Sequence, residues 1–236
     1  MNCIFLRRGY SEVNKGPDYS DNFADNDWAT IIAVCQAGLI PDSWKVGDQK
    51  AMTINGASYP IDIIGIQHDD YSDGSGKAPF TFQFHNCYNT TYQMTEGYSS
   101  SNVGGWEYSA MRTSYLPAIL LLMPSEVQAA IKEVNKLTSL GNQNSAIYTS
   151  TDKLFLPSII EVIGSDGSAK SGEGTRYAYY SAGNSMVKNV NSSANNWWTR
   201  SPYGYNAASF CFIGSSGGIG EAFSIQKYGI APAFCF

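Results

Sequence analysis

The sequence has little charge and almost no histidine. Charged residues make up 15% of the 236 residues, where roughly 25% is usual in soluble domains, and there are only two histidines. The 20 acidic side chains outnumber the 15 basic ones, giving a formal net charge of -5. Because a protein that binds a polyanion needs a basic surface, this balance argues against nucleic acid as a partner.

Long apolar runs are also missing. The densest apolar stretch, residues 118–123, is far shorter than the ~18 residues that read as a membrane-spanning helix. The first eight residues place their apolar side chains before two arginines and lack the apolar core of a secretory signal. We therefore expect a soluble protein, made in the cytoplasm and not inserted in a membrane. Display on a virion or a cell surface would need another export route or a longer precursor.

The cysteines do not have the number or the spacing of a disulfide framework. Five cysteines are an odd number, and no Cys-x-x-Cys pair is present. This pattern is typical of reduced, buried thiols, not of a disulfide scaffold or a zinc site. Only Cys211 and Cys235 are worth testing as a pair.

Motifs for catalysis are equally scarce. No Gly-x-Ser-x-Gly, Walker-type or dinucleotide-type loop stands after a strand with the right partners. His68 lies beside Asp69, Asp70 and Asp73, a possible metal or acid–base cluster, but the spacing of a calcium loop is not met. We interpret it as a solvated hairpin end, and His85 as a structural histidine. We expect no catalytic residue, metal or cofactor.

Residues 1–63 contain two clear periodic patterns. Residues 1–26 are polar apart from an apolar cluster at residues 3–6, and we interpret them as an arm or a first edge strand. A short helix is predicted between a cap in residues 25–27 and Gly38, because one helical face is formed by Trp28, Ile31, Ile32 and Cys35. The turn Asn55-Gly56 between alternating apolar residues predicts a β-hairpin.

The middle and end of the chain predict more strands and helices. Aromatic and polar residues alternate over residues 80–84, which predicts a half-buried strand. We expect helices from Glu107 through Lys136, broken at Pro117 and Pro124, with one face made by Val127, Ile131 and Val134. Short strands are then expected at residues 146–149, 154–156, 197–199, 209–213 and 231–236.

The order of these elements has no βαβ rhythm, which favours an α+β fold. We expect a single domain over residues 27–236, with short β-strands, two or three helices and long loops. Residues 164–196 are loop-like over an unusual length, which is typical of functional or disordered segments.

Three tryptophans are expected to anchor the scaffold. Trp106 follows a glycine pair that permits a tight turn, and Arg112 should tie a helix to an acidic or carbonyl partner. Trp197 and Trp198 are adjacent, so on a strand they point to opposite faces. Arg200 should then hold the chain while Pro202 ends the strand.

Residues 203–224 have the composition of a binding loop. They are built from Tyr, Ser, Gly, Asn, Ala and apolar residues, with Glu221 as the one charged side chain. Tyr provides contact area at low entropic cost, and Ser, Gly and Asn provide adaptable hydrogen bonds. A glycine-rich hairpin without a partner is the alternative, and the outward face of its strand is open at this point.

Several motifs together resemble a known family. Over roughly residues 27–236 the chain resembles an uncharacterised domain family common in gut bacteria and their phages, and its C-terminal part resembles the C-type-lectin-fold variable proteins of diversity-generating retroelements. The resemblance is carried by Asp27-Trp28, Trp44-Lys45-Val46-Gly47-Asp48, Ile64-Gly65 to His68-Asp69, Gly104-Gly105-Trp106 to Met111-Arg112, Leu154-Phe155-Leu156-Pro157-Ser158, Trp197-Trp198-Thr199-Arg200-Ser201-Pro202 and residues 229–236.

In such retroelements a reverse transcriptase copies a template and mutates its adenines, so that a cassette on the ligand-facing surface varies within a fixed scaffold. The resemblance implies that the scaffold includes Trp106, Arg112, Trp197, Trp198, Arg200, Pro202 and Phe234. It implies ligand-binding, variable positions at Tyr203, Tyr205, Asn206, Ala207, Ser209, Cys211, Ile213, Ser215, Ser216, Ile219 and Phe223, whose residue types are reachable from an Asn codon. Glu221 and Gln226 are not reachable.

These observations lead to one leading hypothesis and one alternative. The triplets of calcium-dependent sugar-binding lectins and the cysteine spacing of formylglycine-generating enzymes are absent. The leading hypothesis is a receptor or adhesion protein that binds a protein or cell-surface ligand through residues 203–224. The alternative is a fixed structural or adhesion module of a phage tail or cell envelope.

Overall fold

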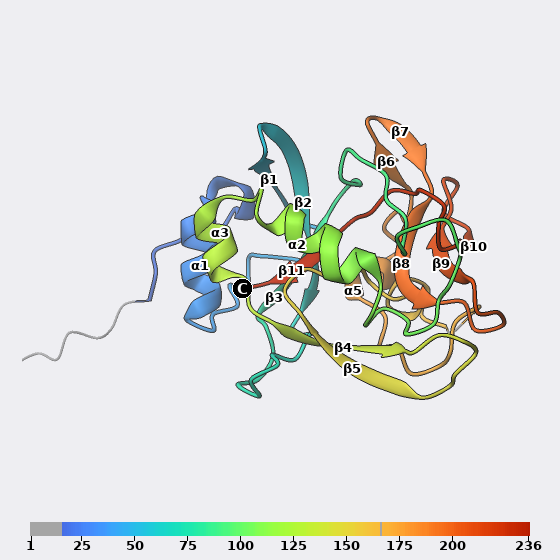
Figure 1. Cartoon of the computed structure of the whole chain (residues 1–236). Coiled ribbons are helices and arrows are strands. Elements are labelled where there is room, and N and C mark those ends of the chain that lie inside the picture. The colour runs from blue at the N-terminus through green and yellow to red at the C-terminus, as the bar shows by residue number, and fades with distance from the viewer. Residues whose placement is uncertain (1–15, 166) are drawn as a thin grey trace, which may run out of the picture.

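The computed structural model describes residues 16–165 and 167–236, and the apolar cluster at residues 3–6 lies outside them. The described chain has a mixed α+β fold, as predicted, with small antiparallel sheets and short helices (Figure 1). No helix among the described residues is long and apolar enough to cross a membrane.

A four-stranded antiparallel sheet forms the centre. Its order is β1-β2-β3-β11, and the predicted hairpin at Asn55-Gly56 joins its first two strands. The C-terminal strand pairs with β3, so the end of the chain lies in the middle of the molecule (Figure 1). The four strands are β1 (Gln49–Ile54), β2 (Ala57–Ile66), β3 (Phe80–Phe84) and β11 (Ala233–Cys235).

Strand β3 is buried on both faces, and the prediction of a half-buried strand is wrong. Its polar residues find partners inside the core. Thr81 donates to Asp69 Oδ2 at 2.5 Å, and Gln83 donates to the Ala231 carbonyl at 3.0 Å. The alternation of aromatic and polar residues therefore reports internal hydrogen bonding and not exposure.

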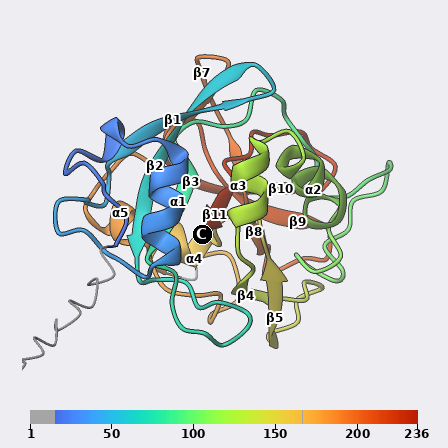
Figure 2. The same ribbon diagram turned by 90° about the vertical axis from the view of Figure 1, so that its left-hand side faces the viewer.

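Two helices cover one end of this sheet. Helix α1 (Trp28–Gln36) begins at the cap Asp27, whose side chain accepts from Thr30 N at 2.7 Å, and it ends before Gly38, as predicted. Helix α3 (Ser125–Ala130) lies beside it (Figure 2). The described part of the N-terminal arm, residues 16–26, contains a 3₁₀ turn at Phe23–Asp25 and no strand.

The predicted helical region ends earlier than expected. It comprises a π-helical turn, η2 (Met111–Tyr115), then α2 (Leu116–Leu120) and α3, but the chain turns extended at Ile131. Val134 and Lys136 belong to strand β4 (Val134–Ser139), which pairs with β5 (Ile147–Asp152). The helical spacing of Val134 was accidental, because strand pairing with Asp152 provides its backbone partner.

A second sheet lies at the opposite end from α1 and α3 (Figure 1). Its order is β10-β9-β8, so β10 is an edge strand. The sequence predicted strands at residues 197–199 and 209–213. It did not predict the strand at residues 219–223, where Gly220 and Glu221 interrupt the apolar pattern. The three strands are β8 (Trp197–Pro202), β9 (Ser209–Ile213) and β10 (Ile219–Phe223).

The long loop predicted at residues 164–196 contains short regular elements, and a further helix precedes it. Residues 154–156 are not a strand, since Phe155 makes only an isolated bridge to Ala233. The added elements are α4 (Ile159–Ile163), α5 (Ala178–Ser181), β6 (Lys188–Val190) and β7 (Ser193–Asn195).

The described cysteines are all buried and free, as predicted for a reduced protein. Cys211 lies on β9 and Cys235 on β11, in different sheets, and the pairing singled out for testing is not formed. Burial raises the pKa of the Cys35 and Cys87 thiols to about 12, so they remain protonated and unreactive at neutral pH.

The glycine pair before Trp106 gives a test of this packing. Gly105 has a φ of +57°, and a Cβ there would lie 2.1 Å from the Ser139 carbonyl oxygen. Gly38 has a similar φ of +67° but open space around it. We expect Gly38→Ala to cost about 1 kcal/mol and Gly105→Ala at least about 2 kcal/mol, measured by urea unfolding. Equal losses would contradict the packing.

Candidate functional site

The two tryptophans of β8 anchor the segment that follows it. Both are fully buried, and they use partners on opposite sides of the strand, as predicted. Trp197 Nε1 donates to the Met186 carbonyl at 2.9 Å, and Trp198 Nε1 donates to the Tyr92 carbonyl at 2.8 Å. Trp198 also packs on the ring of Tyr228, with centroids 4.8 Å apart. Strand β8 is therefore held from both faces.

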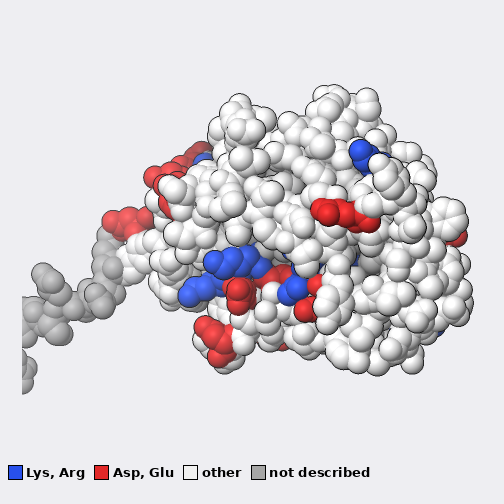
Figure 3. Space-filling view, in the orientation of Figure 1, with Lys and Arg blue, Asp and Glu red and all other residues white. Residues whose placement is uncertain are grey.

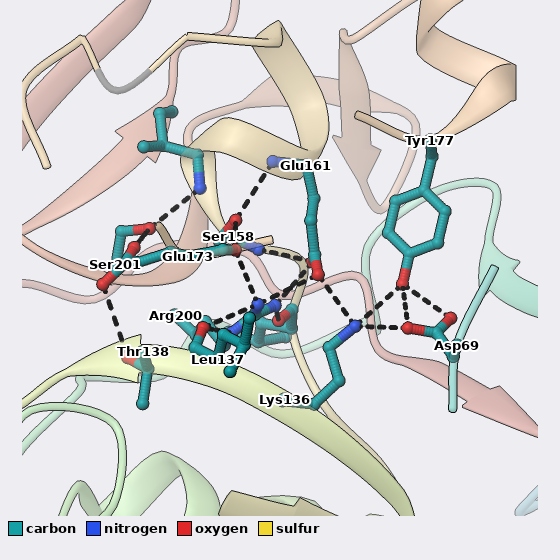
Figure 4. Close-up of polar contacts among 12 residues, drawn as sticks. Asp69, Lys136, Leu137, Thr138, Ser158, Glu161, Glu173, Tyr177, Arg200 and Ser201 are labelled. Atoms are coloured by element: carbon teal, nitrogen blue, oxygen red, sulfur yellow. Dashed lines mark hydrogen bonds and ion pairs between the residues drawn. The ribbon is translucent and has the colours of Figure 1, made fainter. Parts of the chain in front are cut away.

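Arg200 fixes the same strand from within the core. Its guanidinium is fully buried and forms a two-pronged ion pair with Glu161, at 2.6 and 2.9 Å (Figure 4). Its other N–H groups donate to the carbonyl oxygens of Leu137, Leu156 and Glu173 at 3.0–3.2 Å. The predicted tie to the chain is confirmed, and it joins β4, α4 and β8 at one point.

Lys136 extends this network toward the central sheet. Its ammonium contacts Asp69 Oδ1 at 2.6 Å, Glu161 Oε1 at 2.8 Å and the Tyr177 hydroxyl at 3.1 Å (Figure 4). All four side chains are buried. The interpretation of Asp69 as a solvated carboxylate is wrong. Although burial raises the pKa of Asp69, the Lys136 ammonium and His68 lower it to well below its usual range.

The pKa values of the two buried glutamates, Glu161 and Glu173, are shifted in opposite directions. Although burial raises the pKa of Glu161, Arg200 and Lys136 lower it overall. Glu173 accepts from Ser139 N at 2.9 Å and from the Ser201 hydroxyl, and no cation contacts its carboxyl oxygens among the described residues. Burial is therefore the largest effect there and raises its pKa above the usual 4.5.

Of the other polar side chains singled out in the sequence, His68, Asp69 and Asp70 line one cavity, and His85 is not among its lining residues. His68 lines a cavity of about 430 Å³, its ring 4.0 Å from that of Tyr177. Asp70 pairs with Lys77 at 3.1 Å at the surface. His85 binds Asp62 at 2.8 Å at the end of β3, a structural contact. Within residues 16–165 and 167–236, no group of three His, Cys, Asp or Glu side chains is placed to hold a metal.

The segment 203–224 projects beyond this base, and most of its predicted ligand-binding residues reach the surface. Tyr203, Asn206 and Ala207 are half-buried. The exposed positions lie in the loop after β8, in the β9–β10 turn and on the edge strand, and they are Tyr205, Ser215, Ser216, Ile219 and Phe223.

Three of the predicted ligand-binding residues are in the core. Ser209, Cys211 and Ile213 are at most 1% exposed, so they cannot contact a ligand at the surface. Strand β9 is the middle strand of its sheet and is covered on both faces, with only Phe212 partly exposed. Strand β9 therefore has no outward face and contributes only to packing. The edge strand β10 exposes every second side chain to solvent.

A neighbouring loop that sequence reasoning missed holds this segment in place. Asn102 is 1% exposed, and its amide nitrogen donates to the carbonyl oxygens of Tyr203, Asn206 and Ser209 at 2.7–3.3 Å. Its backbone N–H donates to the Ala207 carbonyl at 2.8 Å. In the sequence Asn102 ends a polar run after three serines, with no pattern that distinguishes it.

The same loop adds exposed apolar area beside the segment. Tyr98, Val103 and Tyr108 are among the large apolar side chains most open to solvent. The loop, residues 95–108, and the segment 203–224 contain no lysine or arginine. In the view of Figure 3, the surface over β8–β10 is largely free of charged side chains. The face is thus weakly charged and rich in tyrosine, serine and glycine.

The opposite pKa shifts of the glutamates predict opposite pH effects. The lowered pKa of Glu161 means that its ion pair stabilises the fold at neutral pH and loses this effect as pH falls. Glu161→Gln should cost about 3 kcal/mol at pH 7 and less at pH 4. The raised pKa of Glu173 means that wild-type stability falls as pH rises above the usual 4.5.

The stability of Glu173→Gln relative to wild type should therefore increase from pH 4 to pH 7. The amide does not ionise, its oxygen can accept from Ser139 N, and its nitrogen can donate to the Ser201 hydroxyl oxygen. Urea unfolding of both variants at the two pH values measures the differences. Parallel pH dependence of the two variants would contradict the assignment.

Comparison with known proteins identifies a family. No curated protein and no solved structure matches the chain. A family model described as a domain of unknown function, DUF6273, matches residues 87–236, which include the loop around Asn102, the buried network from Lys136 onward and the exposed segment. The match covers more than half of the chain, and the chain therefore belongs to the DUF6273 domain family.

Proposed function

We propose that this domain is a binding protein of C-type-lectin type that presents a diversified surface to a protein or cell-surface ligand. The observation that carries the proposal is the separation between a rigid base and an exposed segment. Arg200 and the two tryptophans are buried beneath β8, whereas Tyr205, in the loop that follows, is 67% exposed. Such a surface can change its side chains without changing the core.

The chemistry of the segment suits recognition of a protein surface. Tyr205 and Phe223, 56% exposed, offer aromatic contact area. The ammonium of Lys170 lies 5.4 Å from the Tyr205 ring centre, which restrains that ring before binding. Ser215 and Ser216 in the β9–β10 turn add hydroxyl groups for hydrogen bonds. Binding by this surface requires no metal, cofactor or covalent step.

Burial narrows the set of positions that diversification can use. Under the proposal, eight of the eleven predicted positions are available to a ligand, since Ser209, Cys211 and Ile213 are in the core. The exposed aromatic residues of the loop 95–108, Tyr98 and Tyr108, would form a constant part of the same face. In the alternative, a fixed module of a phage tail or cell envelope, the loops of residues 203–224 would instead pack against other subunits.

Sequencing of the gene in its source population distinguishes the diversified binding protein from the fixed module. Under the proposal, substitutions concentrate at Tyr205, Ser215, Ser216, Ile219 and Phe223 and follow adenines of a template, while Trp197, Trp198 and Phe234 stay constant. The codons of residues 95–108 serve as the internal control and stay constant too. Variation spread evenly along the gene would contradict diversification and favour the fixed module.

The separation of base and surface also predicts mutational tolerance. The variants Tyr205→Ser, Ser216→Tyr and Ile219→Ser should each change the free energy of unfolding by less than about 0.5 kcal/mol. Cys211→Tyr and Ile213→Ser change buried positions of the same segment and should each cost about 2 kcal/mol or more. Urea unfolding of the purified variants measures these differences. Equal losses of stability at exposed and buried positions would contradict the separation of base and surface.

A further inference from the structure

The contact between Lys136 and Asp69 is arranged for more than an ion pair. The Lys136 Nζ lies 2.6 Å from Asp69 Oδ1, and the two side chains are 2% and 3% exposed. The ring of Phe155 covers the ammonium, with its centre 4.3 Å from Nζ. An amine and a carboxyl group that are buried in contact are poised for condensation, because positioning alone removes much of the barrier.

The second carboxylate completes the arrangement. Glu161 Oε1 lies 2.8 Å from the same Nζ, so it can accept the protons that the ammonium must lose. The opposite oxygen of Asp69, Oδ2, accepts from the Thr81 hydroxyl at 2.5 Å and from the Tyr177 hydroxyl at 2.9 Å. These two donors are placed to stabilise negative charge on Oδ2 when the carboxyl carbon becomes tetrahedral.

We propose that Lys136 and Asp69 form an intramolecular amide bond, an isopeptide cross-link between β4 and the turn that follows β2. Nζ attacks Cγ of Asp69, and the C–Oδ1 bond breaks. Glu161 takes two of the three ammonium protons in turn and passes both to Oδ1, which leaves as water. The product keeps one N–H and the carbonyl Oδ2, so the atoms and charges balance without a co-reactant.

Glu161 is the base and Asp69 the acceptor because their surroundings differ. Both oxygens of Glu161 are held by the Arg200 guanidinium, so neither is free to leave as water. Among the described residues, the donors to Asp69 besides Lys136 and His68 are hydroxyl and thiol groups. The cavity of about 430 Å³ lined by His68 and Lys136 gives the released water a way out.

The mass of the purified full-length protein tests the proposal. We expect folded wild-type protein to be lighter than its sequence by one water molecule, and a tryptic digest to contain residues 51–77 joined to residues 133–153. The digest is needed because succinimide formation at Asp73-Gly74 or Asp166-Gly167 also releases water but joins no peptides. Full mass after prolonged incubation of the folded protein, or water loss without the joined peptides, would overturn the proposal.

Variants identify the roles of the groups. Lys136→Met should retain the full mass, and Lys188→Met is the matched control, because Lys188 is also buried but donates to the carbonyl oxygens of Phe84 and His85. That control should keep the cross-link. Glu161→Gln should slow water loss at least tenfold when protein unfolded in urea is refolded and its mass followed with time. Unchanged kinetics in a folded Glu161→Gln protein would remove Glu161 from the reaction.

Discussion

The buried ion pair between Arg200 and Glu161 connects segments of the chain that are far apart in the sequence. A guanidinium without exposure to water is tolerated only when all its donors have partners, and here they reach one carboxylate and the backbone of three separate segments. The pair therefore specifies how β4, α4 and β8 come together. A chain with so few charged residues places several of them in its interior, where an incorrect arrangement would leave a charge uncompensated.

This constraint separates the molecule into a rigid base and a permissive surface. Strand β8 is held by Arg200 and its two tryptophans, and β9 is covered on both faces. The edge strand β10 and the turn before it carry little of the core, so their side chains can differ without loss of packing. Asn102 joins the two parts by binding the backbone of the exposed loop, which fixes its path whatever side chains it carries.

The sequence predicted the local elements with strong period or turn signals, such as α1, the hairpin at Asn55-Gly56 and the burial of the tryptophans. It failed where a tertiary partner decides the outcome. Asp69 has the composition of a solvated turn, and only the arrival of Lys136 from a distant strand makes it a core residue. Likewise, alternation could not show that β9 is a central strand, and the resemblance implied a ligand-binding position at Cys211, which is buried. The role of Asn102 depends on contacts about a hundred residues away.

Hydrogen exchange of the full-length protein, resolved by residue, tests whether a rigid base carries a segment whose side chains are free to vary. A rigid base predicts that the amides of β8 and β4 exchange only on global unfolding. The amides of Ala208 and Ser209, which donate to Asn206 Oδ1 at 2.8 and 2.9 Å, should be protected to a lesser extent, and the amide of Ser216 in the β9–β10 turn should exchange fastest. Exchange of β8 as fast as that of the β9–β10 turn would show that the base is not rigid.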